Sequence, residues 1–447
     1  MGQRRQSRLA ARWGRPAAAG LCATLIAAGA ALAQSAAYQD ALRASIAAPG
    51  DPEAAFRFAS IAAEEGDFNA AITALERVLA LAPGLDNVRL ELGVLYLQTG
   101  ATEIGEAYIR EALESPDVPP EVRARAEEYL AAAETANEPL QVGGYITTGL
   151  VAETNANTAP TGLDFGPAIE VDPDTLGQDD VSAFLDAGIS LRYDLGLQAG
   201  HVLALDANAY RQVYSELHQL NLGSIAVSAG ADLNLSRPLG RAAELALRLD
   251  ASTTWRDGER YVTEVGPSAR LGFAVGERTL AEASAFWRRQ EFEPTSAVGA
   301  NDERDGEIYG IGFGAEYSLD EVTRLTGSLS LVHKDARVAY ETYDRASLSL
   351  GVARAFDSPV AAIAGHGPWV GRLGASYAVT DHAGADPLID PTRSRRDRTG
   401  TLSAGLSVPV TPRAVLDAEI GRTVQDSNYV TEEFDNTYGS FSLTIAF

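Results

Sequence analysis

The chain has 447 residues and a formal net charge of −25 at pH 7, because 61 Asp and Glu outnumber 36 Lys and Arg. Such an acidic surface repels nucleic acid, so we expect no nucleic-acid partner. The single cysteine, Cys22, lies in an N-terminal apolar run, so we expect no disulfide or thiol redox chemistry in the rest of the chain.

The first 33 residues have the pattern of a secretory signal peptide. Five arginines form a basic start, an apolar run follows at 17–32, and Ala31 and Ala33 make an A-x-A-like cleavage site. The apolar run is too short to span a bilayer as a helix. We therefore expect residues 1–33 to target the chain for secretion and to be removed.

Residues 34–138 are rich in Ala, Leu and Glu at helical spacing and contain a repeat of 34 positions. Mostly small residues recur at matching places, namely Ala59, Ala62, Gly66 and Ala71 in the first copy and Gly93, Tyr96, Gly100 and Gly105 in the second. This pattern resembles the tetratricopeptide repeat. Two repeats are too few to be stable alone, so flanking helices should complete the stack. A helical plug or spacer and a concave surface for a client protein both fit this region.

From Leu140 onward, apolar and polar residues alternate to the C-terminus. We count fourteen candidate strands, which predict an all-β antiparallel transmembrane barrel over residues 139–447, with an apolar outer face and a wet lumen. The strands should begin near Val142, Val181, Val202, Leu222, Ala242, Tyr261, Thr279, Gly306, Thr323, Asp344, Trp369, Arg398, Ala414 and Phe434. A soluble sheet can show the same alternation. Connections after odd-numbered strands are mostly long or charged, and those after even-numbered strands are mostly short. This rhythm favours a barrel with one end outside and the other in the periplasm.

The last strand, which starts at Phe434, ends on a bare aromatic residue. Phe441, Leu443, Ile445 and Phe447 share one face of this strand, because strand side chains alternate with period two. The pattern is typical of the closing strand of an outer-membrane barrel. We expect this apolar face to contact outer-membrane lipid and the strand to engage the barrel-assembly machinery.

The end of the first predicted strand carries a short motif. Within the sequence ETNANTAP, the residues concerned are Glu153, Thr154, Asn155, Asn157 and Pro160. With the repeats and the fourteen strands, this segment resembles the YDSNVNxAP type of segment in the surface lipoprotein assembly modifiers, or Slam proteins, although Ala152 replaces the aromatic residue. The resemblance implies an outer-membrane protein whose periplasmic helical domain docks a client, such as an exported lipoprotein, for delivery to the cell surface. A plain role in ending the strand also fits Asn155 and Asn157.

No enzyme motif appears in the sequence. The five histidines lie on different predicted strands or connections without a metal-binding spacing, and neither a GxxxxGK[ST] loop nor a GxSxG motif occurs. We therefore expect no catalytic residues, no metal and no cofactor. The one basic cluster lies on a predicted outer loop and consists of Arg393, Arg395, Arg396 and Arg398. These arginines would either bind lipopolysaccharide phosphates or pair with acidic residues.

Two functions fit these patterns. A non-enzymatic export module would use the barrel as a gated passage or lateral exit, which needs weak pairing between the first and last strands. Gly143, Gly144 and Gly149 in the first strand permit such weak pairing. The alternative is a passive or exopolysaccharide-conducting porin that uses the repeats as a partner-binding platform.

Overall fold

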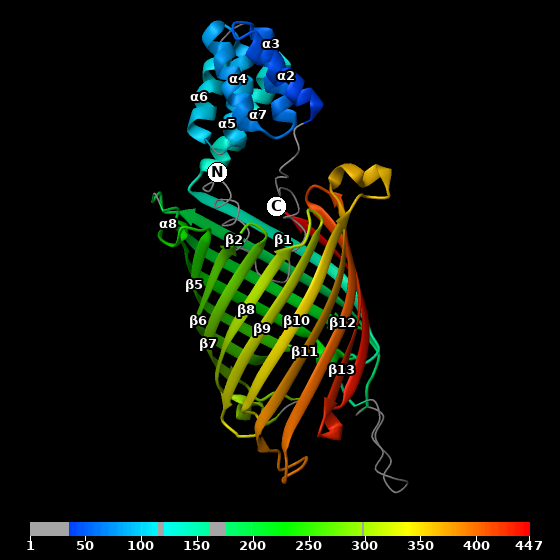
Figure 1. Ribbon diagram of the computed structural model, residues 1–447. Helices are drawn as coiled ribbons and strands as arrows, with labels where there is room; N and C mark the ends of the chain where they lie inside the picture. Colours follow the sequence, from blue (N-terminus) through cyan, green and yellow to red (C-terminus); the bar gives the residue numbers. More distant parts are fainter. Residues whose placement is uncertain (1–34, 100, 115–119, 161–175, 198, 297–298) are drawn as a thin grey trace. The chain divides into compact units, whose positions relative to one another are not determined.

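The computed structural model describes residues 35–447 except 100, 115–119, 161–175, 198 and 297–298. The chain divides into a helical unit that ends at Pro139 and a β unit that runs from Leu140 to Phe447. Figure 1 shows both units. The predicted signal peptide and Gly100 of the second repeat lie outside the described residues.

The helical unit contains two helical hairpins and two flanking helices in the described part of the chain. Its elements are α2 (Ala36–Ala47), α3 (Pro52–Glu64), α4 (Phe68–Leu81), α5 (Asp86–Gln98), α6 (Thr102–Leu113) and α7 (Pro120–Asn137). Side-chain caps explain two of the starts, since Asp51 accepts a hydrogen bond from the Glu53 amide and Asp67 accepts one from the Ala70 amide. Across the described ranges, no helix combines the length and apolar character needed to cross a membrane.

Small residues lie where the helices of each hairpin meet. Ala59, Ala62 and Ala71 are buried in the core of the first hairpin. In the second, a Cβ added to Gly105 would lie 2.8 Å from the Gly93 carbonyl oxygen, so α5 and α6 approach too closely for larger residues. Gly66 has a φ of 78° in the turn between α3 and α4, a conformation that favours glycine.

Tyr38 holds α2 against the start of α4. Its side chain is buried, its ring meets the ring of Phe58 edge-on at 5.2 Å, and its hydroxyl donates a hydrogen bond to Asp67 Oδ2 at 2.8 Å. Burial and the adjacent Asp67 carboxylate raise the pKa of Tyr38 to about 12.

The helical unit should therefore lose stability in alkali. Because the pKa of Tyr38 is raised on folding, its contribution is fully present below the ordinary value of 10.0 and is lost as the pH rises towards about 12. We expect Tyr38→Phe to cost about 1–2 kcal/mol at neutral pH, through the lost hydrogen bond to a charged group, and to flatten this alkaline decline. Far-UV circular dichroism of the full chain in detergent measures both effects, and an unchanged alkaline profile contradicts the assignment.

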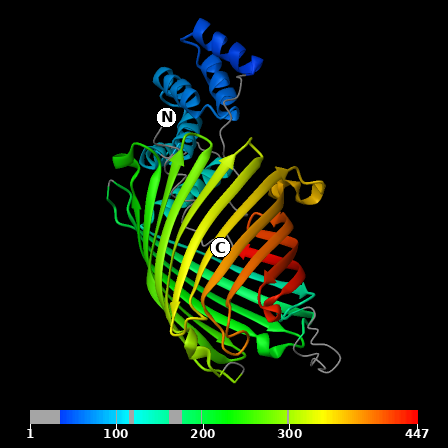
Figure 2. The same cartoon turned by 60° about the horizontal axis from the view of Figure 1, so that its bottom comes forward.

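The β unit is a closed antiparallel barrel in which each strand pairs with its sequence neighbours and β1 pairs with β14. Its fourteen strands are β1 (Leu140–Glu153), β2 (Asp180–Asp194), β3 (Val202–Tyr214), β4 (Leu222–Asn234), β5 (Ala243–Arg256), β6 (Glu259–Val275), β7 (Thr279–Phe292), β8 (Gly306–Ser318), β9 (Thr323–Ala336), β10 (Tyr343–Phe356), β11 (Trp369–Ala385), β12 (Ser394–Thr411), β13 (Ala414–Ser427) and β14 (Phe434–Ala446). Figure 2 shows the barrel from another direction. The predicted fold class is confirmed, and each predicted start lies within two residues of the observed one except in β12.

Side chains alternate between an apolar outer face and a polar lumen. On β2, for example, Leu185 and Ile189 point outward and are 50% and 45% exposed, while Asp186 faces the lumen between them. On β14, Phe441 and Ile445 point outward, as does Phe447 just beyond the strand. An apolar surface of this extent, on a barrel whose backbone is fully paired, is suited to lipid. This is the architecture of an outer-membrane β-barrel.

Candidate functional site

Small polar side chains and ion pairs line the lumen. Across β8 to β13, the cross-strand register places small polar residues side by side in a row formed by Gly314, Ser328, Ser349, Ser376, Thr401 and Thr423. Cross-strand ion pairs also line the lumen, both on this side, as in Arg372–Asp417, and between β2 and β7. Arg192 pairs with Asp206 at 2.9 Å, and Arg288 approaches Asp250 at 3.6 Å.

These ion pairs fasten one side of the barrel. Asp232 on β4 lies between Arg192 and Arg248, so three neighbouring strand pairs are connected through charged side chains in the wall. Carboxylate–guanidinium bonds away from bulk water are among the stronger side-chain hydrogen bonds. Separation of strands should therefore be hard in this part of the barrel.

The seam between β1 and β14 lacks such fastening. Its register runs from Tyr145↔Ala446 to Glu153↔Tyr438, the shortest run of paired residues between neighbouring strands of the barrel. The charged residues of the two strands are Glu153 and Asp435, both acidic, so no ion pair can form across the seam. The export hypothesis requires weak pairing at this seam, and the strength of the pairing stays a prediction.

Two contacts close the seam toward the start of β1, away from the loop that follows this strand. The hydroxyls of Thr147 and Thr444 lie 2.9 Å apart in the lumen. Where β1 begins, Gly144 and Phe447 exchange two backbone hydrogen bonds of 2.9 Å each. A Cβ at Gly144 would meet the Phe447 ring at 2.6 Å, so the glycine allows the terminal aromatic residue to pack against β1.

The motif predicted from the sequence lies at the other end of the seam. Asn155 is 1% exposed, and its backbone amide donates to Asn436 Oδ1 at 3.1 Å while its side-chain amide donates to the Asp435 carbonyl at 3.1 Å. Asn436 donates in turn to Glu153 Oε1 at 2.9 Å. These contacts extend the connection between β1 and β14 beyond the ladder.

Thr154 adds two bonds to the same connection. Its amide donates to the Thr437 carbonyl at 3.0 Å, and its hydroxyl accepts from the Thr437 amide at 2.9 Å. We define the seam clip as Glu153, Thr154 and Asn155 of the first strand and its loop, with Asn436 and Thr437 of β14. The structure thus brings three motif residues together against the last strand.

The other two motif residues organise the loop itself. Asn157 donates to the Leu176 carbonyl at 2.8 Å and accepts from the Gln178 amide at 2.9 Å. The Pro160 carbonyl accepts a hydrogen bond from the Gly177 amide at 3.1 Å. Both residues therefore fix the place where the loop returns to β2. Asn commonly ends a strand by forming a turn, and Asn155 and Asn157 take this role here. Asn155 also makes the seam contacts.

Removal of the Asn155 side chain should weaken the seam. Asn155→Ala leaves the Asp435 carbonyl and the Ala159 amide without their buried partner, at a cost of about 1–3 kcal/mol. We expect a lower temperature for conversion of the compact barrel to the unfolded form on heating in SDS. Asn157→Ala, which removes bonds within the loop but none to β14, is the matched control. Equal shifts for both variants would show that Asn155 acts through the loop and not through the seam.

The predicted basic cluster is not a free anion site. β12 begins at Ser394, so three of the four arginines belong to a strand and not to an outer loop. Each has an acidic partner: Arg393 pairs with Asp390, Arg395 with Asp397 and Glu432, Arg396 with Asp381, and Arg398 with Asp426. The acid-paired alternative is the correct one. Arg396 and Arg398 lie opposite their partners on the neighbouring strands, whereas Arg393 and Arg395 pair with acidic residues close in sequence or in the connection after β13.

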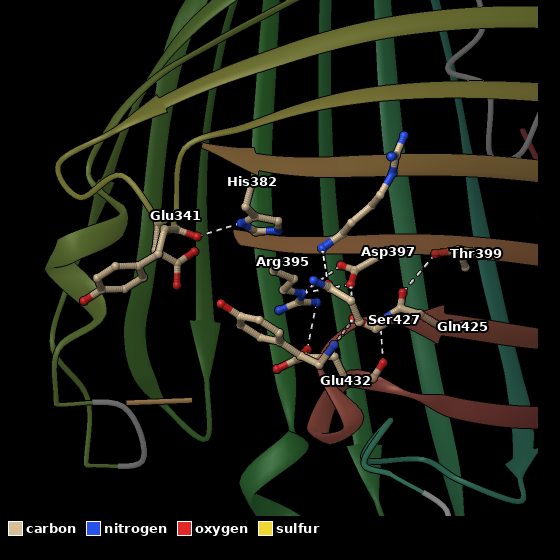
Figure 3. A network of polar contacts seen from close by, with 12 residues as sticks. Glu341, His382, Arg395, Asp397, Thr399, Gln425, Ser427 and Glu432 are labelled. Carbon is tan, nitrogen blue, oxygen red and sulfur yellow. Dashed lines mark hydrogen bonds and ion pairs between the residues drawn. The ribbon is translucent and has the colours of Figure 1, made fainter. Parts of the chain in front are cut away.

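Arg395 is the centre of a polar network near the start of β12. It lies 2.8 Å from Asp397 and 2.7 Å from Glu432, and Ser427 donates to Asp397 at 2.7 Å. Figure 3 shows these residues pointing toward one another from β12, β13 and the connection after β13. Burial raises the pKa of Glu432, although Arg395 opposes this shift. The network joins β12 and β13 to the connection after β13.

Two of the histidines hydrogen-bond to neighbouring groups. His382 bonds the Tyr340 carbonyl and His333 bonds Asp344, each through Nδ1. Among the described residues, no group of three or more His, Cys, Asp or Glu is placed to hold a metal ion.

The helical unit carries a shallow groove with a volume of about 420 Å³. Apolar side chains of Leu79 and Tyr108 line it, together with the carboxylates of Glu76 and Glu111. Tyr96 donates to Glu76 at 2.5 Å, and this bond raises the pKa of Tyr96 to about 12. Arg89 also lines the groove and pairs with Glu111 at 3.1 Å, so the lining is mixed polar and apolar.

Residues 62–133 match the tetratricopeptide repeat family model. The tetratricopeptide domain also has a structural similarity to the type III secretion translocator chaperone SycD of Yersinia enterocolitica, with 15% identity, a TM-score of 0.21 and coverage of 22% of this chain and 69% of that one. The barrel is similar to the outer-membrane channel DcaP of Acinetobacter baumannii, with 9% identity, a TM-score of 0.40 and coverage of 69% and 97%. It is also similar to an anion-selective porin from Comamonas acidovorans, with 12% identity, a TM-score of 0.35 and coverage of 69% and 99%. No curated protein matches the sequence.

Proposed function

We propose that this protein is a non-enzymatic export module of the outer membrane, similar to the Slam proteins. In this proposal the tetratricopeptide domain receives a lipoprotein or another exported protein, and the barrel assists its passage to the cell surface. The observation that carries the proposal is the seam, because its run of paired residues is the shortest between neighbouring strands of the barrel and a lateral exit would open there. The junction motif that resembles the Slam segment forms the clip of that seam.

The course of the chain supports one orientation of the barrel. An even number of strands returns the C-terminus to the end of the barrel where β1 begins, and the tetratricopeptide domain is joined to β1 at that end. Short connections such as 276–278 and 319–322 lie there, which favours the periplasmic side for that end. We propose that the domain lies in the periplasm and meets its client there.

Surface exposure of a lipoprotein tests the proposal. Candidate lipoproteins encoded next to this gene are co-expressed with the full chain or with an empty vector in a Gram-negative host. Accessibility to external protease and antibody is then measured on intact cells. We expect surface exposure only with the full chain, and unchanged exposure for every neighbouring candidate would contradict the proposal.

A porin is the second candidate, favoured by the row of small polar residues along β8 to β13. Such a wall offers little to obstruct a hydrated solute. Single-channel recording in planar bilayers separates the two candidates. Steady conductance without a client favours a porin, whereas a closed barrel that conducts only after the seam clip is removed favours the export module.

A further inference from the structure

Aromatic side chains gather on the lumenal face of β1, β2 and β3. They alternate along each strand with outward residues such as Ile146 and Leu185, and they are Tyr145, Phe184, Tyr210 and Tyr214. The register places Phe184 beside Gly149 and Gln212, and Tyr145 beside Gly188. We define these four residues as the aromatic wall. Its length along β1, from Tyr145 to the level of Val151, is about 20 Å.

Two of these rings lie over glycines of the neighbouring strand. A Cβ at Gly149 would meet the Phe184 ring at 2.7 Å, and a Cβ at Gly188 would overlap the Tyr145 ring. Each ring therefore covers the bare backbone of the neighbouring strand on the lumenal side of the barrel. Phe184 and Tyr210 are stacked, with centroids 6.2 Å apart and planes inclined by 27°.

Planar polar groups lie between the rings in fixed orientations. The Asn208 amide donates to the Tyr145 hydroxyl at 2.9 Å and to Asp186 Oδ1 at 2.5 Å. The Gln212 amide donates to Tyr214 at 3.2 Å and accepts from the Tyr210 hydroxyl at 2.9 Å. The wall therefore combines flat apolar faces with amide, carboxylate and hydroxyl groups in a polar lumen.

We propose that the aromatic wall binds an uncharged oligosaccharide. A pyranose ring presents C–H bonds on its face and hydroxyls at its edge, so it can stack on an aromatic ring while it bonds amides and carboxylates beside that ring.

The charge of the wall excludes an anionic chain. Glu153 and Asp186 lie beside the rings, and Arg192, the inward basic residue of these three strands, is occupied by Asp206. An acidic sugar would meet these carboxylates without a compensating cation. The inference is independent of the proposed function, since the wall binds sugar whether the barrel exports a protein or conducts a solute.

Isothermal titration of the full chain in detergent tests the inference. Maltohexaose is the uncharged probe and hexagalacturonate is the anionic probe. We expect maltohexaose to bind and hexagalacturonate not to bind. Phe184→Ala should weaken maltohexaose binding about threefold to tenfold, the loss expected for one aromatic contact.

Phe286→Ala is the matched control. Phe286 also covers a glycine, Gly310, but it lies on β7 outside the aromatic wall. Both variants lose the same side chain, and migration in SDS before and after heating verifies that each is folded. Unchanged binding by Phe286→Ala supports the inference. Three results would overturn it: absence of maltohexaose binding, equal weakening by both variants, or hexagalacturonate binding as tight as that of maltohexaose.

Discussion

Gly230→Ala should prevent the barrel from closing between β4 and β5. A Cβ at Gly230 would overlap the carbonyl oxygen of Leu247 on the neighbouring strand. This oxygen belongs to the backbone of the ladder in which Gly230 faces Arg248, so it cannot rotate away as a side chain does. Overpacking in a well-packed region costs about 1–3 kcal/mol, and displacement of the strand adds lost backbone hydrogen bonds.

The measurement is the fraction of protein that migrates as the compact form in SDS before heating. We expect most of the Gly230→Ala protein to be unfolded. Gly400→Ala is the control, because it makes the same change in β12 at a position with no atom within 4 Å of the added Cβ. A normally folded Gly230→Ala barrel would show that β4 and β5 move apart at little cost.

A disulfide across the seam should abolish export. Thr147 and Thr444 are directly opposite each other, and their hydroxyls are 2.9 Å apart, so a Thr147→Cys and Thr444→Cys pair is placed to form a disulfide. Cys22 is the only native cysteine and lies in the predicted signal peptide. If the client leaves through the seam, oxidation of the pair should reduce surface display by at least about tenfold, and a reductant should restore it.

The barrel offers a matched pair elsewhere. Thr401 and Thr423 face each other on β12 and β13, with hydroxyls 3.0 Å apart, and the same cysteine replacements there bridge strands far from the seam. Oxidation of this second pair should leave surface display unchanged. Loss of display with both pairs would indicate that any rigid bridge blocks the passage. Normal display with an oxidised seam pair would eliminate the lateral exit.

The fold could be predicted because its physical causes are local. Alternation of apolar and polar residues appears within each strand, and the 34-residue period appears within two helical hairpins. The start of β12 was predicted late, near Arg398, because arginines in succession look like a loop when their acidic partners are unseen. Three of the partners, Asp381, Asp426 and Glu432, lie on β11, β13 and the connection after β13, and only the fold brings them near.

The candidate site could be predicted only in part for the same reason. The motif at Asn155 is visible in the sequence, but Asn436 lies 281 positions away, and no local signal connects the two residues. The aromatic wall was missed because Gly149 and Gly188 look like isolated small residues. Their meaning appears only when the rings of Phe184 and Tyr145 cover them from neighbouring strands.

The short link between the two units has a mechanical consequence. α7 ends at Asn137 and β1 begins at Leu140, so only Glu138 and Pro139 separate them. A tensile load on the tetratricopeptide domain is therefore transmitted first to β1, which is one of the two strands with the least lateral support. A pulling force on a protein bound by this domain would therefore act on β1 before it reaches the ion-paired strands.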